Sequence, residues 1–350
     1  MGIKLIHTAD LHLSNKKPET INALDEILTI ARKEEVDIVT ISGDLFDSAL
    51  DADNLRPRLR EKFSNNDFDI IVIPGNHDSD VYQQDYSFGS NFIPMVEKPF
   101  QIKTKGNLNL VALPYVERLT KDLLTEIQKQ SKKNKTNILL IHCTLDIGFC
   151  KNDFGEETKT KYCPISKSEL SRLNYDFILA GHFHKKSEII ELNENSQFIY
   201  PGSPVSLTSK ELEKRNVVFI DTINNDFSLI PLNTFYFDKL HKSVYPGKED
   251  LIANEVTNWV IERSKENCTL EVIIDGFIQI SEKSFETKLS KIKKFAKITH
   301  DYKDIQIVLK NPLFHRFKEK LMEKNLPNSH ELELVAIDAL SQLISSGEIK

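Results

Sequence analysis

Cysteine is scarce in this sequence, and the few cysteines present are not spaced as metal ligands. The four of them, Cys143, Cys150, Cys163 and Cys268, form no C-x-x-C pair. This spacing argues against a zinc ribbon and gives no sign of the disulfide framework that small secreted domains use. We therefore expect the protein to work in a reducing cytoplasm.

The sequence also lacks a long apolar run and an excess of positive charge. No stretch approaches the ~20 apolar residues that cross a bilayer, and no apolar leader precedes the strand-like run at residues 3–6. We expect a soluble protein with no membrane partner. The formal net charge of −6 excludes a basic coat for nucleic acid, although it leaves room for a local basic track.

The first half of the chain has the pattern of an α/β domain. A chain of 350 residues is long for a single domain, so we expect two domains, or one domain with appendages. Apolar strand-like runs alternate with helix-like segments, which predicts βαβ units and a largely parallel sheet. The expected strands are residues 3–9, 36–41, 70–73, 108–113, 138–141 and 177–179, and the expected helices are residues 18–35, 53–65 and 120–132.

After residue 187 the pattern changes to short strands joined by tight turns. These predict an antiparallel completion of the sheet, with a hairpin turn at Asn224-Asn225-Asp226. A break at residues 233–247 precedes a smaller unit that we expect to be α+β. Its expected elements are a helix at 248–265, a strand at 269–275, a helix at 282–297, a strand at 305–309, and closing helices at 312–324 and 329–346.

Seven potential metal ligands occur in five short motifs, each at the end of an apolar strand. The motifs are Asp10-Leu11-His12, Gly43-Asp44, Gly75-Asn76-His77-Asp78, His142 and Gly181-His182-Phe183-His184. Ligands bind where parallel strands end, at their carboxyl edge. Carboxylate, carboxamide and imidazole ligands without a thiolate suit two divalent metals rather than one structural zinc. Two metals held together are a known means of hydrolysing phosphate esters.

Each motif also has an ordinary structural explanation. Asp10 could be a turn or helix-cap residue, His142 could be a satisfied strand-end histidine, and Asn76 could belong to a polar turn. Asp47, in the same turn as Asp44, could instead be the important acid, but we favour a capping role before the next helix. Five independent explanations at five strand ends are less probable than one common cause. The other histidines are interpreted as structural: His7, His241, His300, His315 and His330.

The ordered motifs resemble those of the calcineurin-like metallophosphoesterases. Residues 8–13 (TADLHL), 43–47 (GDLFD), 113–115 (LPY) and 200–203 (YPGS) further resemble the SbcD-type nucleases of DNA double-strand-break repair, called Mre-eleven in archaea and eukaryotes. The resemblance implies a four-layer α/β sandwich, the calcineurin-like phosphoesterase fold, as a nuclease domain at residues 1–235. A small α+β DNA-capping domain at 236–310 and a C-terminal helical segment at 311–350 would follow it.

The resemblance also implies roles for the motif residues. The first metal would be bound by Asp10, His12 and His184, and the second by Asn76, His142 and His182, with Asp44 bridging both. Manganese would be the working metal, and the attack on the phosphodiester would be in line. His77, oriented by Asp78, would protonate the leaving sugar oxygen.

Two other functions remain open. A phosphomonoesterase or small-substrate phosphodiesterase could use the same scaffold, but a terminal phosphate is usually clamped by arginine, and no arginine lies in or beside the five motifs. A non-catalytic subunit of an ATPase complex would have no need for all seven ligands. One departure from the family is that archaeal and eukaryotic members often have a histidine where this chain has Asp47, so this sequence is closer to the bacterial branch.

The expected partners are DNA, a second copy of the chain and an SbcC-type (Rad-fifty) ABC ATPase with a coiled coil. For DNA, the candidates are Lys185-Lys186 and a second group that would line one helix side: Lys288, Lys291, Lys293, Lys294 and Lys297. An ordinary solvated helix face is an equally good interpretation of the second group. The apolar faces of the two terminal helices either pack on the chain itself or, as the resemblance implies, grip the base of the ATPase coiled coil.

Overall fold

The computed structural model describes residues 2–82, 87–146 and 163–349 of the chain. By its internal contacts the chain divides into two compact units, Met1–Phe237 and Asp238–Lys350. No helix in the described part of the chain is long and apolar enough to cross a membrane. Cys143 and Cys163 carry free thiols, while Cys150 lies outside the described residues.

The first unit contains two six-stranded sheets rather than the one sheet that the strand–helix alternation alone predicts. In the first sheet the order is β14 (Asp226–Pro231), β13 (Asn216–Asp221), β1 (Lys4–Thr8), β2 (Ile38–Ser42), β3 (Asp69–Ile73) and β4 (Phe92–Pro94). In the second it is β11 (Glu188–Asn193), β12 (Ser196–Tyr200), β10 (Phe177–Gly181), β7 (Thr136–His142), β6 (Leu108–Ala112) and β5 (Gln101–Lys105).

The central strands of each sheet are parallel, and antiparallel strands complete both sheets, although β12 runs parallel to β10 and β4 is a parallel edge. Strands β1 to β4 run parallel, as do β6, β7, β10 and β12. Strands β13 and β14 form the predicted hairpin beside β1, turning at residues 222–225. Strands β11 and β5 are the antiparallel edges of the second sheet, and β8 (Thr144–Asp146) pairs with β9 (Pro164–Ser166) separately.

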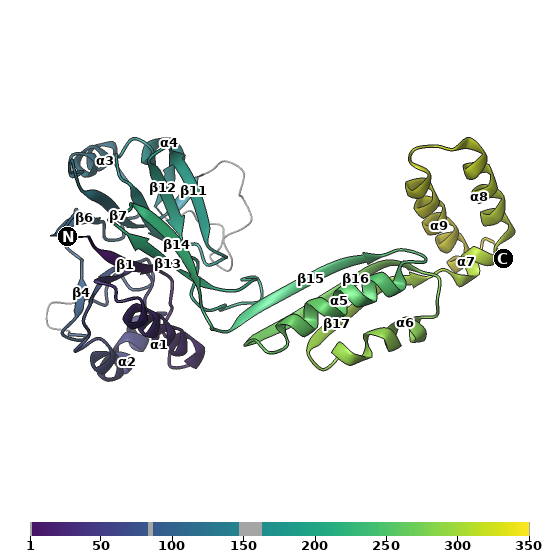
Figure 1. The fold of residues 1–350 in the computed structure, drawn as a ribbon, viewed down its shortest axis with the longest axis horizontal. Coiled ribbons are helices and arrows are strands. Elements are labelled where there is room, and N and C mark those ends of the chain that lie inside the picture. The colour runs from purple at the N-terminus through teal and green to yellow at the C-terminus, as the bar shows by residue number, and fades with distance from the viewer. Residues whose placement is uncertain (1, 83–86, 147–162, 350) are drawn as a thin grey trace. The chain divides into compact units, whose positions relative to one another are not determined.

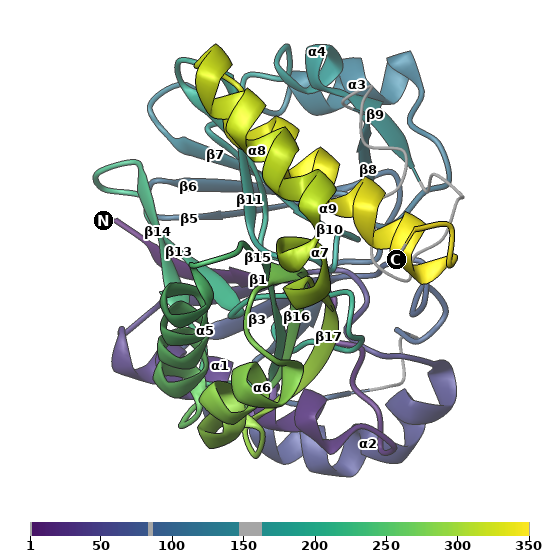
Figure 2. The ribbon, with the colours of Figure 1, turned by 90° about the vertical axis from the view of Figure 1, so that its right-hand side faces the viewer.

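Alternating side chains of the strands build three apolar layers. Leu5 and Ile38 pack between the two sheets, where Leu140 of the second sheet meets them. Their neighbours Ile6 and Val39 face α1 (Pro18–Lys33) and α2 (Ala49–Lys62) on the outer side of the first sheet. A third layer packs the second sheet against α3 (Lys121–Gln128) and α4 (Lys167–Leu170), on the opposite side (Figures 1 and 2). The predicted four-layer α/β sandwich is therefore confirmed.

The second unit begins with a small α+β structure. Its sheet has the order β15 (Tyr236–Val244), β16 (Cys268–Ile278) and β17 (Ala296–Asp304). Helices α5 (Glu249–Arg263) and α6 (Glu282–Leu289), together with the short 3-10 turn η1 (Ser290–Ile292), share an apolar core with these strands. Strand β15 occupies most of residues 233–247, so this stretch is not a loop, but the boundary between the two units, after Phe237, does lie within it as expected.

Two other expectations for this unit were wrong. The helix predicted over residues 282–297 ends at Leu289, because Ala296 and Ile298 pair with Leu270 and Val272 of β16 instead. This long-range pairing outweighs the helical preference of the lysine-rich segment. The strand predicted at 305–309 is the helix α7 (Gln306–Lys310); Val308 in this helix and Ile305 just before it pack into a terminal apolar cluster.

The chain closes with the two predicted helices, α8 (Pro312–Lys324) and α9 (Ser329–Ser345). Asn311 caps α8 by accepting a hydrogen bond from the Leu313 amide, and Pro312 occupies the first helical position. A small apolar cluster that includes Phe314 and Ile337 joins the helices. Several large apolar side chains remain exposed on them, including Leu313, Met322 and Val335.

Candidate metal centre

The five predicted motifs meet where the parallel strands of both sheets end. Asp10 and His12 follow β1, Asp44 follows β2, Asn76 and His77 follow β3, His142 ends β7, and His182 and His184 follow β10. In the parallel pairing of β10 with β7, Gly181 lies opposite His142. All seven predicted ligands except Asn76 are buried, while Asn76 is half-buried and His77 is exposed at the rim.

An unusual backbone brings these side chains together. Asp10, His12 and Asp44 adopt the left-handed region with φ of 54°, 45° and 49°. Such conformations are costly for residues other than glycine and concentrate at functional sites. Gly43 has φ of 89°, and a Cβ atom there would lie 2.2 Å from His142 Nδ1. The glycine is needed both for the turn and for the close approach of His142.

Four of the predicted ligands form one compact group. The candidate ligand atoms of Asp10, His12, Asp44 and His184 all lie within 4.8 Å of one another. His12 Nε2 is 3.1 Å from His184 Nε2 and 3.9 Å from Asp44 Oδ2. This group corresponds to the residues predicted for the first metal, together with the predicted bridging carboxylate.

The second predicted group lies on the other side of Asp44. His142 Nε2 is 2.9 Å from Asn76 Oδ1 and 3.3 Å from Asp44 Oδ2. The rings of His142 and His182 pack edge to face, with their centroids 5.3 Å apart. His142 Nδ1 lies 2.9 Å from the Ser42 carbonyl, so donating to it leaves Nε2 facing the centre.

Asp44 lies between the two groups. Its Oδ1 accepts a hydrogen bond from the His77 amide at 2.9 Å, while Oδ2 is buried and accepts no hydrogen bond of ordinary geometry. Burial opposes ionisation, but the neighbouring His142 and His12 imidazoles hold the pKa of Asp44 below its usual range. A buried carboxylate oxygen without a donor is costly, and a cation would compensate it. The group of Asp10, His12, Asp44 and His184 therefore fits a divalent cation, while a second cation that shares Asp44 stays a prediction.

The side chains of Asp10 and Asp78 accept hydrogen bonds that connect different motifs. Both Asp10 oxygens lie 2.9 Å from the His182 amide, which donates to them, and burial raises the pKa of this carboxyl. Asp78 accepts hydrogen bonds from the Gly75 amide at 2.7 Å, the Leu45 amide at 2.9 Å and the Tyr82 hydroxyl at 2.7 Å. Burial and the nearby Asp44 raise the pKa of Asp78 to about 6.

These contacts join the loops after β2 and β3 through the Asp78 side chain. The expectation that Asp78 orients His77 stays a prediction. The His77 ring lies beside the centre, with its centroid 4.8 Å from that of His12. Its exposure places it where a substrate group can reach it.

Asp47 lies at the centre, although the sequence reasoning favoured a capping role for it. That interpretation was wrong, because the N-cap of α2 is Ser48, whose hydroxyl oxygen accepts a hydrogen bond from the Asp51 amide. Asp47 Oδ1 instead lies 3.3 Å from His12 Nδ1, and His12 and His77 form a candidate ligand group with it. The weighed alternative, in which Asp47 takes the place of Asp44, does not hold either, because Asp44 lies in the buried group with His12 and Asp47 lies beside His12 in addition to it.

Glu211 was missed altogether. It is buried, and its Oε1 lies 3.7 Å from His184 Nδ1. Burial opposes its ionisation, but His184 and other neighbours hold the pKa of Glu211 below its usual range. Glu211 follows the centre's last motif by more than 25 residues and belongs to no motif, so the sequence carried no signal for it.

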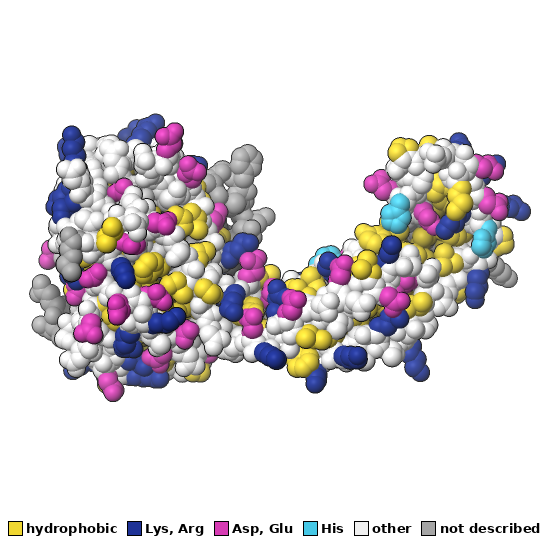
Figure 3. Space-filling view, in the orientation of Figure 1, with side chains coloured by type: hydrophobic (Ala, Val, Ile, Leu, Met, Phe, Trp, Pro, Cys, Tyr) yellow, Lys and Arg dark blue, Asp and Glu magenta, His cyan; other side chains and the backbone are white. Residues whose placement is uncertain are grey.

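The lysines proposed for DNA do not lie along one helix, so that interpretation was wrong. Lys288 is in α6, Lys291 in η1 and Lys297 in β17. Several are paired with acids: Lys288 with Asp250, Lys293 with Glu286, Lys297 with Glu271, and Lys186 with Glu213. Over the visible face, Lys and Arg side chains are mixed with Asp and Glu side chains (Figure 3).

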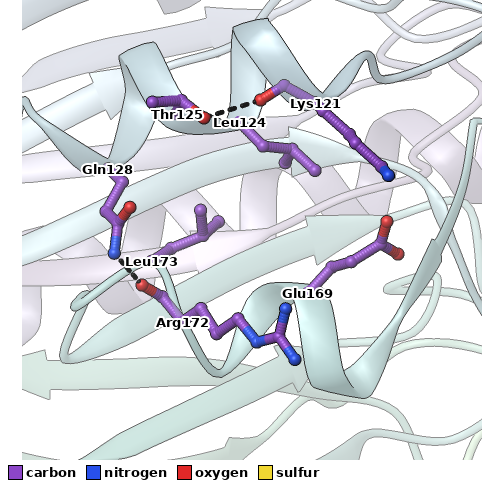
Figure 4. Close-up of a pocket in the computed structure, with 7 residues that line it drawn as sticks. All are labelled: Lys121, Leu124, Thr125, Gln128, Glu169, Arg172 and Leu173. Atoms are coloured by element: carbon purple, nitrogen blue, oxygen red, sulfur yellow. Dashed lines mark hydrogen bonds between the residues drawn. The ribbon is translucent and has the colours of Figure 1, made fainter.

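A pocket of about 310 Å³ lies apart from the centre, between α3 and α4 (Figure 4). Lys121 and Arg172 line it together with Glu169, whose carboxylate is engaged by Ser166 at the start of α4. None of the residues predicted from the motifs lines this pocket. The residues predicted from the motifs therefore lie at the centre and not in this pocket.

Comparison with known proteins gives one family match and several distant relatives. The model of the calcineurin-like phosphoesterase family matches residues 3–186, more than half of the chain. An uncharacterized metallophosphoesterase, YhaO of Bacillus subtilis, is 22% identical over 306 residues, covering 80% of this chain and 69% of that protein.

Two relatives carry names from DNA metabolism. The DNA double-strand break repair protein Mre11 of Sulfolobus acidocaldarius is 23% identical over 341 residues, covering 88% of this chain and 84% of that protein. A component of the nuclease SbcCD of Staphylococcus epidermidis is 24% identical over 273 residues, covering 66% of this chain and 70% of that protein.

Proposed function

Because the chain belongs to the calcineurin-like phosphoesterase family, we propose that it is a two-metal phosphodiesterase that cleaves DNA. It would serve as the exonuclease or endonuclease subunit of a double-strand-break repair complex, with Mn²⁺ as its metal. The observation that carries this proposal is the position of Asp44 between two groups of predicted ligands. The names of the relatives from Sulfolobus acidocaldarius and Staphylococcus epidermidis support DNA as the substrate.

The residues of the centre would divide the reaction between them. Two bound divalent metals supply a nucleophile at neutral pH and charge neutralisation for the phosphate. Asp10, His12 and His184 would hold one ion, Asn76, His142 and His182 the other, and Asp44 both. His77, at the exposed rim, would donate a proton to the leaving oxygen, with Asp78 fixing the loop that carries it.

The position of Arg215 supports a diester over a terminal phosphate. Arg215 is buried beside the centre, but its guanidinium donates to the backbone carbonyls of Ser203, Leu212 and His184. A guanidinium that is bound in this way is not presented to a substrate. A phosphomonoester would leave a dianion that usually needs such a clamp.

The most informative experiment compares three substrates: linear duplex DNA, bis(p-nitrophenyl) phosphate and p-nitrophenyl phosphate. Each is incubated with the full chain in Mn²⁺ and again with a chelator. We expect cleavage of DNA and of the diester that the chelator abolishes. Metal-dependent cleavage of the monoester alone would overturn the proposal in favour of a phosphomonoesterase.

We also propose partners for the second unit. Residues 236–310 would cap the DNA, and α8 and α9 would bind the base of the coiled coil of an SbcC-type ABC ATPase, in a complex with two copies of this chain. The exposed Leu313, Met322 and Val335 on these helices support the second proposal. A chain truncated at Asn311 should lose the ATPase in a pull-down, and retention of the ATPase would remove this part of the proposal.

A further inference from the structure

The outer nitrogens of two imidazoles at the centre both face carboxylates. His12 and His184 meet through their Nε2 atoms, 3.1 Å apart. On the far side of each ring, His12 Nδ1 lies 3.3 Å from Asp47 Oδ1 and His184 Nδ1 lies 3.7 Å from Glu211 Oε1. A metal-binding imidazole commonly donates its other N–H to a carboxylate, which fixes the orientation of the ring and its tautomer.

Glu211 is held so that one oxygen faces His184. Its Oε2 accepts hydrogen bonds from the Ser203 hydroxyl at 3.1 Å and the Leu207 amide at 2.8 Å. The Ser206 hydroxyl donates to the Glu211 carbonyl at 2.6 Å, which fixes the backbone as well. Oε1 then has His184 Nδ1 and the Thr208 hydroxyl, at 3.4 Å, as its polar neighbours.

Nearby, Arg215 holds the backbone that carries His184. Its guanidinium donates to the carbonyls of His184, Lys185 and Ser203. Its hydrogen bonds therefore go to carbonyls, and the structure shows none of them going to Glu211. Burying an acid is unfavourable unless charges and donors compensate it. The charge of Arg215 compensates part of this cost for the completely buried Glu211, but the hydrogen bonds of its guanidinium leave Glu211 Oε1 directed at His184.

We propose that Glu211 is a positioning residue for His184, one that sets the affinity of the first metal site. It would receive the Nδ1 proton of the ring, keep Nε2 unprotonated toward the cation, and add negative charge behind the ligand. This inference rests on the proposed two-metal function. It adds to that function a residue from a loop outside the five motifs.

The test is a Mn²⁺ titration of metal-stripped full-length protein by calorimetry. Glu211→Gln keeps the shape of the side chain and removes its charge. We expect about a 10- to 100-fold loss of affinity at one site, with the other site close to wild type. The matched control is Glu213→Gln, an exposed acid two residues further on that pairs with Lys186, which should titrate like wild type.

Two outcomes overturn the proposal. One is a folded Glu211→Gln protein with wild-type affinity at both sites, and the other is an equal loss at both sites, which would indicate a general structural role. Circular dichroism and the thermal midpoint in chelator establish that the variant is folded. If Glu211→Gln does not fold, Glu211→Asp takes its place, since it keeps the charge but withdraws the carboxylate from Nδ1. It too should lose affinity at one site, and wild-type binding there would contradict the proposal.

This readout is separate from the substrate. A wild-type chain that binds two Mn²⁺ ions but leaves DNA intact would contradict the proposed nuclease activity without touching the role of Glu211. A selective change in the titration of Glu211→Gln would still stand in that case.

Discussion

At the scale of single residues, the centre buries several ionisable groups close together. Asp44 Oδ2 is buried, with the Nε2 atoms of His142 and His12 at 3.3 and 3.9 Å. Asp10 and Glu211 are buried acids next to imidazoles. Burial of so many ionisable side chains is unfavourable for folding. Such clusters are expected at functional sites.

His77→Ser should lower cleavage of the diester by about 10²- to 10⁴-fold, because the leaving oxygen would lose its proton donor. Binding of both metals should persist, since His77 is not among the predicted ligands. The measurement pairs the rate of bis(p-nitrophenyl) phosphate hydrolysis with a Mn²⁺ titration. His300→Ser removes an exposed histidine of the second unit and serves as the control. Retained activity in His77→Ser would refute the role of His77 as the proton donor.

His7 should make the stability of the first unit sensitive to acid. Burial between the sheets lowers the pKa of His7 to about 3, from 6.5. Below pH 6.5 the unfolded chain therefore takes up a proton that the folded chain does not. The contribution of His7 to the free energy of unfolding is complete above pH 6.5. It is lost as the pH falls toward 3, at about 1.4 kcal/mol per pH unit.

His7→Leu should flatten this dependence. The Thr40 hydroxyl would keep its hydrogen bond to the Ile6 carbonyl in the variant. Urea unfolding at pH 6.5 and pH 5, in chelator, should show a loss about 2 kcal/mol smaller than in wild type. Equal losses in the two proteins would mean that His7 is not buried in its neutral form.

At the scale of elements, the site depends on how the strands end. Each predicted ligand follows or closes a parallel strand, so the sheets bring together residues that are far apart in the sequence. Gly43 shows the constraint most clearly, because its backbone conformation and its contact with His142 both exclude a side chain. The loops after the strands are thus part of the site.

Gly43→Ala should abolish Mn²⁺ binding at the site that includes His142, because a Cβ atom would lie 2.2 Å from His142 Nδ1. The left-handed backbone adds a cost of about 1 to 2 kcal/mol. Gly347→Ala is the matched control, since Gly347 also has a positive φ, of 76°, but nothing lies within 4 Å of its Cβ position. Calorimetry on both variants makes the comparison, and two intact sites in Gly43→Ala would contradict this account of the turn.

The sequence predicted the elements whose signals are local. Buried strands such as β2 and β7 are continuous apolar runs, and the motifs at their ends could be read directly. The end of α6 could not be predicted, because Ala296 and Ile298 are placed by pairing with a strand more than 20 residues away. The positions of Asp47 and Glu211 at the centre could not be predicted for a similar reason. Their importance comes from His12 and His184, which only the fold brings beside them.

At the scale of the whole molecule, the chain combines a family domain with a second unit whose role is still a prediction. The first unit holds all seven predicted ligands. The net charge is −6, and several lysines of the second unit are paired with acids. If DNA is the substrate, overall charge would attract it only weakly, and cations bound at the centre would be an important source of positive potential.

The central claim is that two divalent cations share Asp44. The direct measurement is the electron paramagnetic resonance spectrum of the full chain loaded with Mn²⁺, together with the metal content per chain. We predict two ions per chain with the exchange coupling expected at a separation of about 3.5 to 4 Å, and loss of that coupling in Asp44→Asn. A single ion, or two ions without coupling, would contradict the account.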